Sequence, residues 1–302
     1  MKVLFCISDG IGNVFQALPV VSTLERTHGW DFSFLFCGTN YPLTSRVLGR
    51  PVMKLGTVTE SDIRGFDGII ATGKAWDKIN DHFIGLDALL INDPASQYLR
   101  QVKKWTRSEV DWRLDIARSL GCEEMIYDYA LSVQDPDKRY DVVIANGYNL
   151  NGNDKDKWHI KQYARWADVV KILKNDIPDI KIASLGTDHA KEYVAGTESL
   201  IGLPIEQSLE HVKASKVLLC NDTGLYHASQ LLGTKAIVFF SFTDQIKGFD
   251  KRFHKSADKV SLELPCMYQC FKQRKVHQCK NHICRYYDPA DIVDRALREI
   301  KR

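Results

Sequence analysis

Residues 217–240 read VLLCNDTGLYHASQLLGTKAIVFF, and this stretch decides the fold class. An apolar run of strand type, 217–220, precedes the polar turn 221–224, a helical pattern that Gly233 ends, and a second apolar run, 236–240. A strand, a helix and a strand in this order predict two parallel strands joined by a crossover helix. We therefore expect an α/β protein built on parallel sheets.

The turn of this unit is suited to an anion. Asp222 and Thr223 are residue types that cap helix N-termini, and Gly224 lets a ligand come close to the backbone. The first turn of a helix offers N–H groups and partial positive charge to a phosphate, and His227 on that turn can donate to the same anion. The residues alone leave two interpretations level: a phosphate site, or an ordinary capped helix with a buried histidine.

The segment Asp-Thr-Gly-Leu-Tyr-His at 222–227, with Ala228 and the run 231–234 after it, resembles the signature of glycosyltransferase family 9. This is the heptosyltransferase family of GT-B fold. The resemblance implies two doubly wound, Rossmann-like parallel-sheet domains that face a cleft. It also implies that Asp222, Thr223, Gly224 and His227 hold the diphosphate of a nucleotide-sugar donor.

The bulk composition is that of a soluble globular protein. The 302 residues suit two domains, with 44% apolar and 26% charged residues and a net charge of +3. That charge is too small to argue for nucleic acid by itself, and the basic stretch 97–107 around Trp105 adds little support because acidic residues follow it. No apolar run approaches the roughly 20 residues of a membrane span, and the strand pattern after Met1 is unlike a signal peptide. We expect a cytoplasmic protein.

The first domain is expected over residues 1–137, ending in the linker-like composition of 134–139. It opens with a buried strand, 2–7, a glycine-containing turn, 8–13, and a helix, 14–27, in which Pro19 is unfavourable. A turn between the first strand and first helix is the usual ligand site of an open α/β sheet. Further elements are strands at 31–37, 67–73 and 88–91, and an amphipathic helix at 109–120. The polar face of this helix is expected to be solvated, with acceptor binding as the alternative.

This turn also resembles family 9, whose first loop reads Gly-Asp followed by apolar residues and a proline. The resemblance implies that this domain binds the acceptor and that the Asp is the general base. This chain has Asn13 after Gly12, and an amide cannot take up a proton at neutral pH. Asn13 can orient the acceptor instead, with Gly12 lining the ligand-facing turn. Asp9 is the nearest carboxylate that could act as the base, although a turn-capping role for it is favoured.

The second domain is expected over residues 138–302, and its first strand, 140–145, leads into Asn146 and Gly147. By resemblance, this turn and Lys157 contact the donor phosphates, and Lys157 balances charge on the leaving diphosphate. The residues alone favour a solvent-exposed lysine.

The later strands of this domain end at further ligand-facing turns. Strand 180–185 ends at Gly186 and Thr187, which lie near the nucleoside in GT-B folds, and Glu192 is a candidate for a ribose hydroxyl. Thr243 and Asp244 match a family segment near the sugar, whereas Ser241 replaces its glycine.

Four of the eight cysteines, Cys266, Cys270, Cys279 and Cys284, have the spacing C-x3-C-x8-C-x4-C. Four thiols in a short span can make a tetrahedral zinc or iron site, and some family 9 proteins have a similar segment. The alternative is a set of reduced thiols or a disulfide formed on oxidation. We expect a structural zinc or iron that is not needed for catalysis. A final helix, 289–300, is expected to pack back on the first domain.

We predict a glycosyltransferase that moves heptose or a similar sugar, with inversion, from an ADP- or UDP-sugar to an acceptor hydroxyl. The acceptor is a glycan, lipopolysaccharide, lipid-linked or protein group, which would fit peripheral membrane contact. The catalytic candidates are Asn13, Asp9, Lys157 and His227. Three alternatives remain: a GT-B sugar-nucleotide epimerase, a non-catalytic nucleotide-sugar-binding protein and a phage-type DNA glycosyltransferase.

Overall fold

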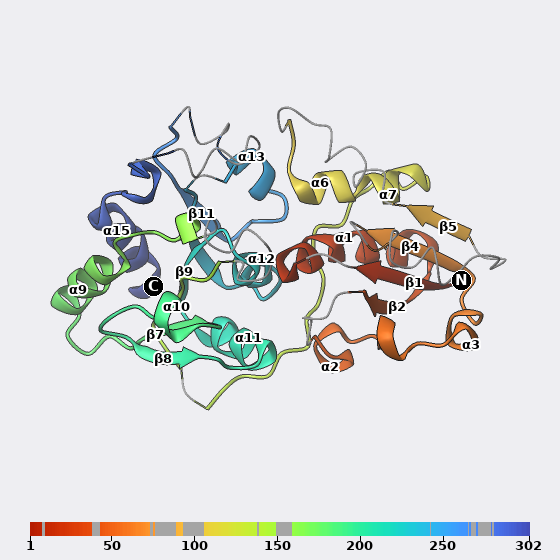
Figure 1. Cartoon of the computed structure of the whole chain (residues 1–302), viewed down its shortest axis with the longest axis horizontal. Coiled ribbons are helices and arrows are strands. Elements are labelled where there is room, and N and C mark those ends of the chain that lie inside the picture. Colours follow the sequence, from red (N-terminus) through yellow and green to blue (C-terminus); the bar gives the residue numbers. More distant parts are fainter. Residues whose placement is uncertain are drawn as a thin grey trace. The chain divides into compact units, whose positions relative to one another are not determined.

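The computed structural model divides into two compact units, Met1–Ser132 and Val133–Arg302, drawn from red to yellow and from green to blue in Figure 1. The domain boundary predicted from the sequence, after Asp137, lies a few residues beyond the boundary in the structure, which follows Ser132. The structure describes residues 1–7, 10–37, 43–72, 75, 89–92, 106–137, 139–148, 159–241, 243–264, 266, 270, 279 and 281–302.

The first unit is built on a five-stranded parallel sheet in the order β3-β2-β1-β4-β5. Residues 3–7 of the central strand are fully buried, which explains their unbroken apolar run. Strand β3 was not predicted, because three half-exposed residues show no periodicity. The strands are β1 (Lys2–Ile7), β2 (Asp31–Phe36), β3 (Val52–Lys54), β4 (Gly68–Thr72) and β5 (Leu89–Asn92).

Helix α1 (Ile11–His28) begins earlier than predicted, so Gly12 and Asn13 lie in its first turn rather than in a loop. Pro19 is accommodated inside it. The other described helices of this unit are α2 (Ser45–Leu48), η1 (Leu55–Thr57), α3 (Glu60–Ile63), α6 (Glu109–Arg113) and α7 (Asp115–Ser119).

The helix predicted at 109–120 is broken at Leu114 into α6 and α7. Its polar face is not simply solvated, as had been expected. Glu109 and Arg113 are buried and joined by an ion pair of 2.9 Å, and Arg118 pairs with Asp111 at 2.7 Å. The charges on this face therefore satisfy one another.

The second unit contains a six-stranded parallel sheet in the order β8-β7-β6-β9-β10-β11. In chain order this is 3-2-1-4-5-6, the doubly wound arrangement, and the winding reverses between β6 and β9. The edge strands β8 and β11 were not predicted because they are short and partly exposed. The strands are β6 (Val142–Ala145), β7 (Ile182–Gly186), β8 (Glu198–Ile201), β9 (Val217–Asn221), β10 (Lys235–Phe239) and β11 (Ala257–Val260).

Both faces of this sheet are covered. Along β9, Val217 and Leu219 enter one apolar cluster, whereas Leu218 and Cys220 enter another. This alternation between two buried faces explains why the strand reads as continuously apolar.

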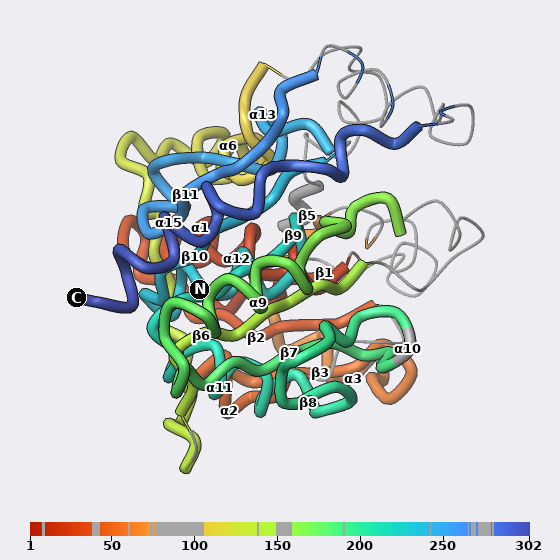
Figure 2. The backbone as a smooth tube through the Cα atoms, turned by 90° about the vertical axis from the view of Figure 1, so that its left-hand side faces the viewer, coloured from red at the N-terminus to blue at the C-terminus, as the bar shows by residue number. Residues whose placement is uncertain are grey.

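The last helix, α15 (Pro289–Ile300), buries its apolar face beside α9 (Trp166–Asp176) in its own unit (Figure 2). The other described helices of this unit are η3 (His159–Lys161), α10 (His189–Glu192), α11 (Ile205–Ala214), α12 (Gly224–Leu231), α13 (Gln245–Gly248) and η5 (Ile283–Arg285). Among the helices of the described ranges, none combines the length and the apolar character needed to cross a bilayer.

Candidate functional site

The predicted anion site lies at the carboxyl end of β9, next to the point where the winding of the second sheet reverses. Helix α12 begins there, and Thr223 is its N-cap with an extended backbone (φ −132°, ψ 173°). The Thr223 hydroxyl, however, makes no capping bond to the helix, contrary to the capping role considered above. The first turn of α12 therefore lacks the side-chain cap that would compete with an anion.

Three residues with hydroxyl groups follow the carboxyl ends of the neighbouring strands β9 and β10. The oxygens of Thr223, Ser241 and Thr243 are buried and have no hydrogen-bond partner among the described residues. Ser241 and Thr243 are only 1% and 4% exposed. Since buried polar atoms are almost always hydrogen-bonded, these oxygens indicate a site that a polar ligand or water completes.

Asp222 is held by a lysine that sequence reasoning missed. The Lys161 ammonium lies 3.0 Å from the Asp222 carboxylate and donates to the Asp222 carbonyl at 2.7 Å. Burial by itself raises the pKa of Asp222, but the Lys161 cation and, less strongly, the neighbouring His227 outweigh it and bring the pKa to about 2. Asp222 is therefore ionised and neutralised by Lys161. The predicted Lys157 and its neighbour Trp158 lie outside the described residues.

His227 lies on the first turn of α12, as predicted, and it is buried. Its Nε2 is 3.8 Å from the Asp222 carboxylate, and its Nδ1 is 3.0 Å from Nε2 of His254. The Asp250 N–H donates to the other nitrogen of His254 at 2.8 Å. Two imidazole rings are therefore connected in series behind the start of α12.

Asn146 and Gly147 follow β6, on the other side of the winding reversal. The amide of Asn221, the last residue of β9, donates to the Asn146 side chain at 3.0 Å and accepts from the Tyr163 N–H at 3.0 Å. This pair of asparagines links the ends of the two central strands, β6 and β9, next to the candidate anion site.

The turn after β7 is occupied by Glu192 rather than open to a ribose. The Glu192 carboxylate is 1% exposed and accepts the N–H groups of Thr187 and Asp188, together with the Tyr148 N–H at 3.4 Å. A Cβ on Gly186 would lie 2.2 Å from this carboxylate. Glu192 thus shapes the Gly186 and Thr187 turn, so its suggested contact with a ribose hydroxyl is not supported.

In the first unit, Asn13 is half-buried and its N–H donates to the Gly10 carbonyl at 2.8 Å. Gly10 precedes the helix, and Gly12 lies inside its first turn. Asp9 lies outside the described residues. The described second-unit candidates converge on the ends of β6, β7, β9 and β10, whereas Gly12 and Asn13 belong to the first turn of α1 in the first unit.

Within the cysteine segment, the structure describes residues 266, 270, 279 and 281–284. Burial, followed by the neighbouring thiols Cys270, Cys279 and Cys266, raises the pKa of Cys284 to about 12. The Cys279 sulfur accepts the His282 N–H at 3.3 Å. Across the described ranges, no three histidine, cysteine or acidic side chains are grouped closely enough to hold a metal.

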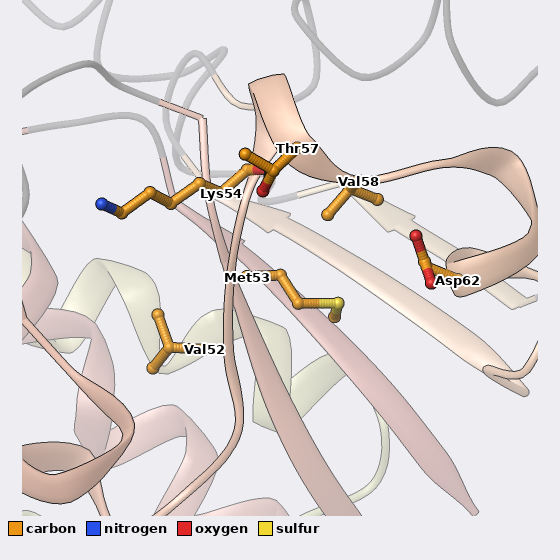
Figure 3. Close-up of a pocket in the computed structure, with 6 residues that line it drawn as sticks. All are labelled: Val52, Met53, Lys54, Thr57, Val58 and Asp62. Atoms are coloured by element: carbon orange, nitrogen blue, oxygen red, sulfur yellow. The ribbon is translucent and has the colours of Figure 1, made fainter.

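A pocket of about 390 Å³ lies in the first unit, beside the edge strand β3 (Figure 3). Its polar groups include Asp62, whose carboxylate already accepts the N–H and hydroxyl of Thr59. None of the predicted site residues lines it. Its lining residues are Val52, Met53, Lys54, Thr57, Val58 and Asp62.

No family model and no curated protein matches this sequence. Solved structures nevertheless match nearly all of it. The ADP-heptose lipopolysaccharide heptosyltransferase II of E. coli has a TM-score of 0.70 and 14% identity, covering 99% of this chain and 98% of its own. A family 9 glycosyl transferase from Veillonella parvula has a TM-score of 0.68 and 10% identity, with 99% and 97% covered.

A third similar structure is the iron-containing dodecameric glycosyltransferase TibC of enterotoxigenic E. coli. Its TM-score is 0.64 at 14% identity, over 99% of this chain and 76% of TibC. Together with the two doubly wound sheets, these matches confirm the predicted architecture: this chain has the GT-B fold of the family 9 heptosyltransferases.

Proposed function

We propose that this protein is a glycosyltransferase whose second unit binds the diphosphate of a nucleotide-sugar donor at the start of α12. The observation that carries this proposal is the group of buried hydroxyls on Thr223, Ser241 and Thr243 without partners in the described part of the chain. Hydroxyl donors beside an uncapped helix N-terminus suit phosphate oxygens.

The ion pair beneath the site supports the same ligand. An ionised Asp222 alone would repel a diphosphate, but Lys161 lies 3.0 Å from it and cancels its charge. The electrostatic environment of the diphosphate is then set by the partial positive charge at the start of α12 and by the N–H of His227.

In the proposed reaction, an acceptor oxygen attacks the anomeric carbon while the bond to the diphosphate breaks, with inversion. Donors aimed at the departing diphosphate stabilise the charge that develops there. The helix N-terminus, the hydroxyls, His227 and the predicted Lys157 supply them. Asn13 cannot take the acceptor's proton, so its role would be to orient the acceptor, and Asp9 is the nearest carboxylate in the sequence that could act as the base.

The donor proposed first is an ADP-sugar, with heptose or a similar sugar, because the solved heptosyltransferases of this fold include one described with ADP-heptose in its name. UDP-sugars are the second choice. The acceptor is proposed to be a hydroxyl of a glycan, lipopolysaccharide or other biopolymer.

Calorimetric titration with ADP, UDP and ADP-heptose tests the donor site. We expect Thr243→Val to weaken diphosphate binding by roughly tenfold or more, because a hydrogen bond to a charged oxygen contributes about 1.5–3 kcal/mol. Its free energy of unfolding should change little, since the hydroxyl has no partner among described residues.

The matched control is Thr234→Val. Its hydroxyl is equally buried but donates to the Val212 carbonyl at 3.0 Å, so it should lose about 1 kcal/mol of stability and keep nucleotide affinity. Absence of binding and turnover with every nucleotide sugar would exclude the proposed function.

A non-catalytic nucleotide-sugar-binding protein is the second candidate, because an amide stands where the family has its base. Turnover by the unaltered protein excludes it. Binding without turnover, together with activation by Asn13→Asp, would show that only the base is missing.

We also propose that the cysteine segment binds a structural zinc or iron ion. The spacing of the four cysteines and the N–H bond from His282 to the Cys279 sulfur support this, since bonds of this kind stabilise thiolate ligands. The thiols would draw together on binding the ion, because in this structure they are not grouped closely enough to hold it. Elemental analysis of the purified protein should find about one metal per chain, lost in Cys284→Ser and kept in the control Cys122→Ser. A metal-free, stably folded protein would contradict the proposal.

A further inference from the structure

Behind the proposed phosphate site, two buried histidines form a chain of hydrogen bonds, of which the proposed reaction uses only His227. The backbone N–H of Asp250 lies 2.8 Å from Nδ1 of His254, and Nε2 of His254 lies 3.0 Å from Nδ1 of His227. His227 and His254 are 5% and 1% exposed, so water reaches neither ring freely.

The direction of the first bond is decided by the Asp250 backbone. Its N–H can only donate, so Nδ1 of His254 must present a lone pair. The Asp250 carbonyl also lies 3.1 Å from this nitrogen, but it already accepts the backbone N–H groups of Phe253 and His254 at 3.1 and 2.6 Å. A hydrogen on Nδ1 of His254 would clash with the hydrogen of the Asp250 backbone N–H, which points at the same nitrogen.

His254 therefore carries its proton on Nε2. Burial, reinforced by the neighbouring His227, lowers the pKa of His254 well below its usual range, so the ring is neutral and has a single N–H. Its plane is also held, because it stacks on Tyr226 at 4.5 Å and on Phe249 at 5.5 Å between ring centroids.

The same reasoning extends to His227. The N–H of His254 points at Nδ1 of His227, which must then accept and keep its own proton on Nε2. That nitrogen lies 3.8 Å from the ionised Asp222 carboxylate, which also favours a hydrogen on that side. In the opposite tautomer, a neutral His227 would present a lone pair towards the site and would repel an anion.

We propose that His254 is a positioning residue that fixes the tautomer of His227, so that a neutral His227 donates its Nε2 hydrogen to a phosphate oxygen of the donor. The anion part of this inference rests on the proposed function. The tautomer part concerns the ligand-free protein and can be tested without any nucleotide.

The first experiment is nitrogen-15 NMR of histidine-labelled, ligand-free protein, in which long-range correlations show which ring nitrogen carries each proton. We expect both His227 and His254 to carry it on Nε2. His227 protonated on Nδ1 in the unaltered protein would overturn the inference, and this measurement needs no variant that folds.

The second experiment compares two variants. His254→Phe keeps an aromatic ring between Tyr226 and Phe249 but cannot donate, so His227 should become a mixture of tautomers and ADP affinity should fall roughly tenfold. His254→Gln places an amide donor near the former Nε2, and should return His227 to its Nε2 tautomer with affinity within about threefold of the unaltered protein.

The control is His28→Phe, which makes the same substitution at an exposed histidine of the first unit. Equal tautomers and equal ADP affinity in His254→Phe and the unaltered protein would overturn the positioning role. A third outcome is that the tautomer of His227 shifts as expected but neither the unaltered protein nor the variants bind ADP. In that case the proposed function fails, and the conclusion that His254 fixes the tautomer of His227 is retained.

Discussion

The carboxyl ends of the two sheets share one topology and carry different side chains. In the second unit, Asn221 at the end of β9 bonds to Asn146 beyond β6, and Lys161 and Asp222 pair beside them. In the first unit, the described link between the corresponding central strands is the Thr72 hydroxyl, which donates to the Cys6 carbonyl at 3.2 Å.

The helices that follow the central strands differ in the same way. In the first unit, α1 starts after Gly10, and residues 14–21 are all buried. In the second, α12 starts among Asp222, Thr223 and His227. A doubly wound sheet therefore supplies the position of a ligand site, whereas the polar side chains at each switch point decide how much charge it can hold.

The largest difference between the units should come from Lys161→Met. Removing this ammonium leaves the mostly buried Asp222 carboxylate without its cation, and we expect a loss of about 3 kcal/mol in the free energy of unfolding together with loss of ADP binding. Urea unfolding and calorimetry measure the two effects. The control is Lys171→Met, an exposed position on α9, which should change neither.

The same ion pair predicts a pH dependence. Because the pKa of Asp222 is lowered from 3.8 to about 2 in the folded protein, its stabilisation is complete above about pH 4 and is lost as the pH falls towards 2. Its size is on the order of 2 kcal/mol. The stability gap between wild type and Lys161→Met should hold from about pH 7 to 4 and narrow at about pH 3; a gap independent of pH would contradict this assignment.

Asn221→Ala should cost about 2.5 kcal/mol, because it leaves the buried N–H of Tyr163 without its partner and breaks the bond to Asn146. The corresponding change in the first unit, Thr72→Val, keeps the shape and removes one hydroxyl bond, so it should cost about 1 kcal/mol. Chemical unfolding of both variants measures the difference. Equal losses in the free energy of unfolding would mean that these two side-chain links contribute equally to the stability of their sheets.

Gly186→Ala tests the filled turn of the second unit. The new Cβ would meet the Glu192 carboxylate at 2.2 Å and its Cβ at 2.8 Å, so we expect a loss of about 2 kcal/mol. At Gly10, no heavy atom lies within 4 Å of a built Cβ and φ is −61°, so Gly10→Ala should stay within about 0.5 kcal/mol of wild type. Thermal unfolding should separate the pair, and a stable Gly186→Ala would show that Glu192 moves away easily.

The smallest effect is expected from Asn13→Asp. A carboxylate in the first turn of α1 interacts favourably with the helix dipole, which should stabilise the protein by about 0.5 kcal/mol at low salt. ADP affinity should not change if the donor binds only to the second unit. A large change in affinity would mean that residue 13 contributes to the donor site.

Much of this architecture was predictable because the strands are buried on both faces. The runs at 3–7 and 217–220 are apolar without interruption, and both belong to central strands. The strands β3, β8 and β11 escaped prediction because edge positions leave them short and partly exposed. The break at Leu114 also escaped, since an amphipathic pattern continues through it.

The residues of the candidate site also divide into those that a local pattern predicted and those that it could not. One local motif of six residues, 222–227, contains Asp222, Thr223, Gly224 and His227. The fold that this motif predicts is confirmed by the TM-score of 0.70 to a heptosyltransferase. Lys161 was missed because the sequence has several lysines in that region and nothing local distinguishes the one that reaches Asp222.

By itself, the sequence determined the parallel sheets, the strand–turn–helix unit around Asp222 and the absence of a carboxylate at residue 13. These are properties of neighbouring residues, and hydrophobic periodicity and turn chemistry express them directly. Only the tertiary structure decided that Lys161 neutralises Asp222, that Glu192 accepts the N–H of Tyr148, and that His254 lies next to His227. The physical reason is that each of these contacts joins different strand ends, which become neighbours only when the sheet winds from β6 to β9 and on to β11.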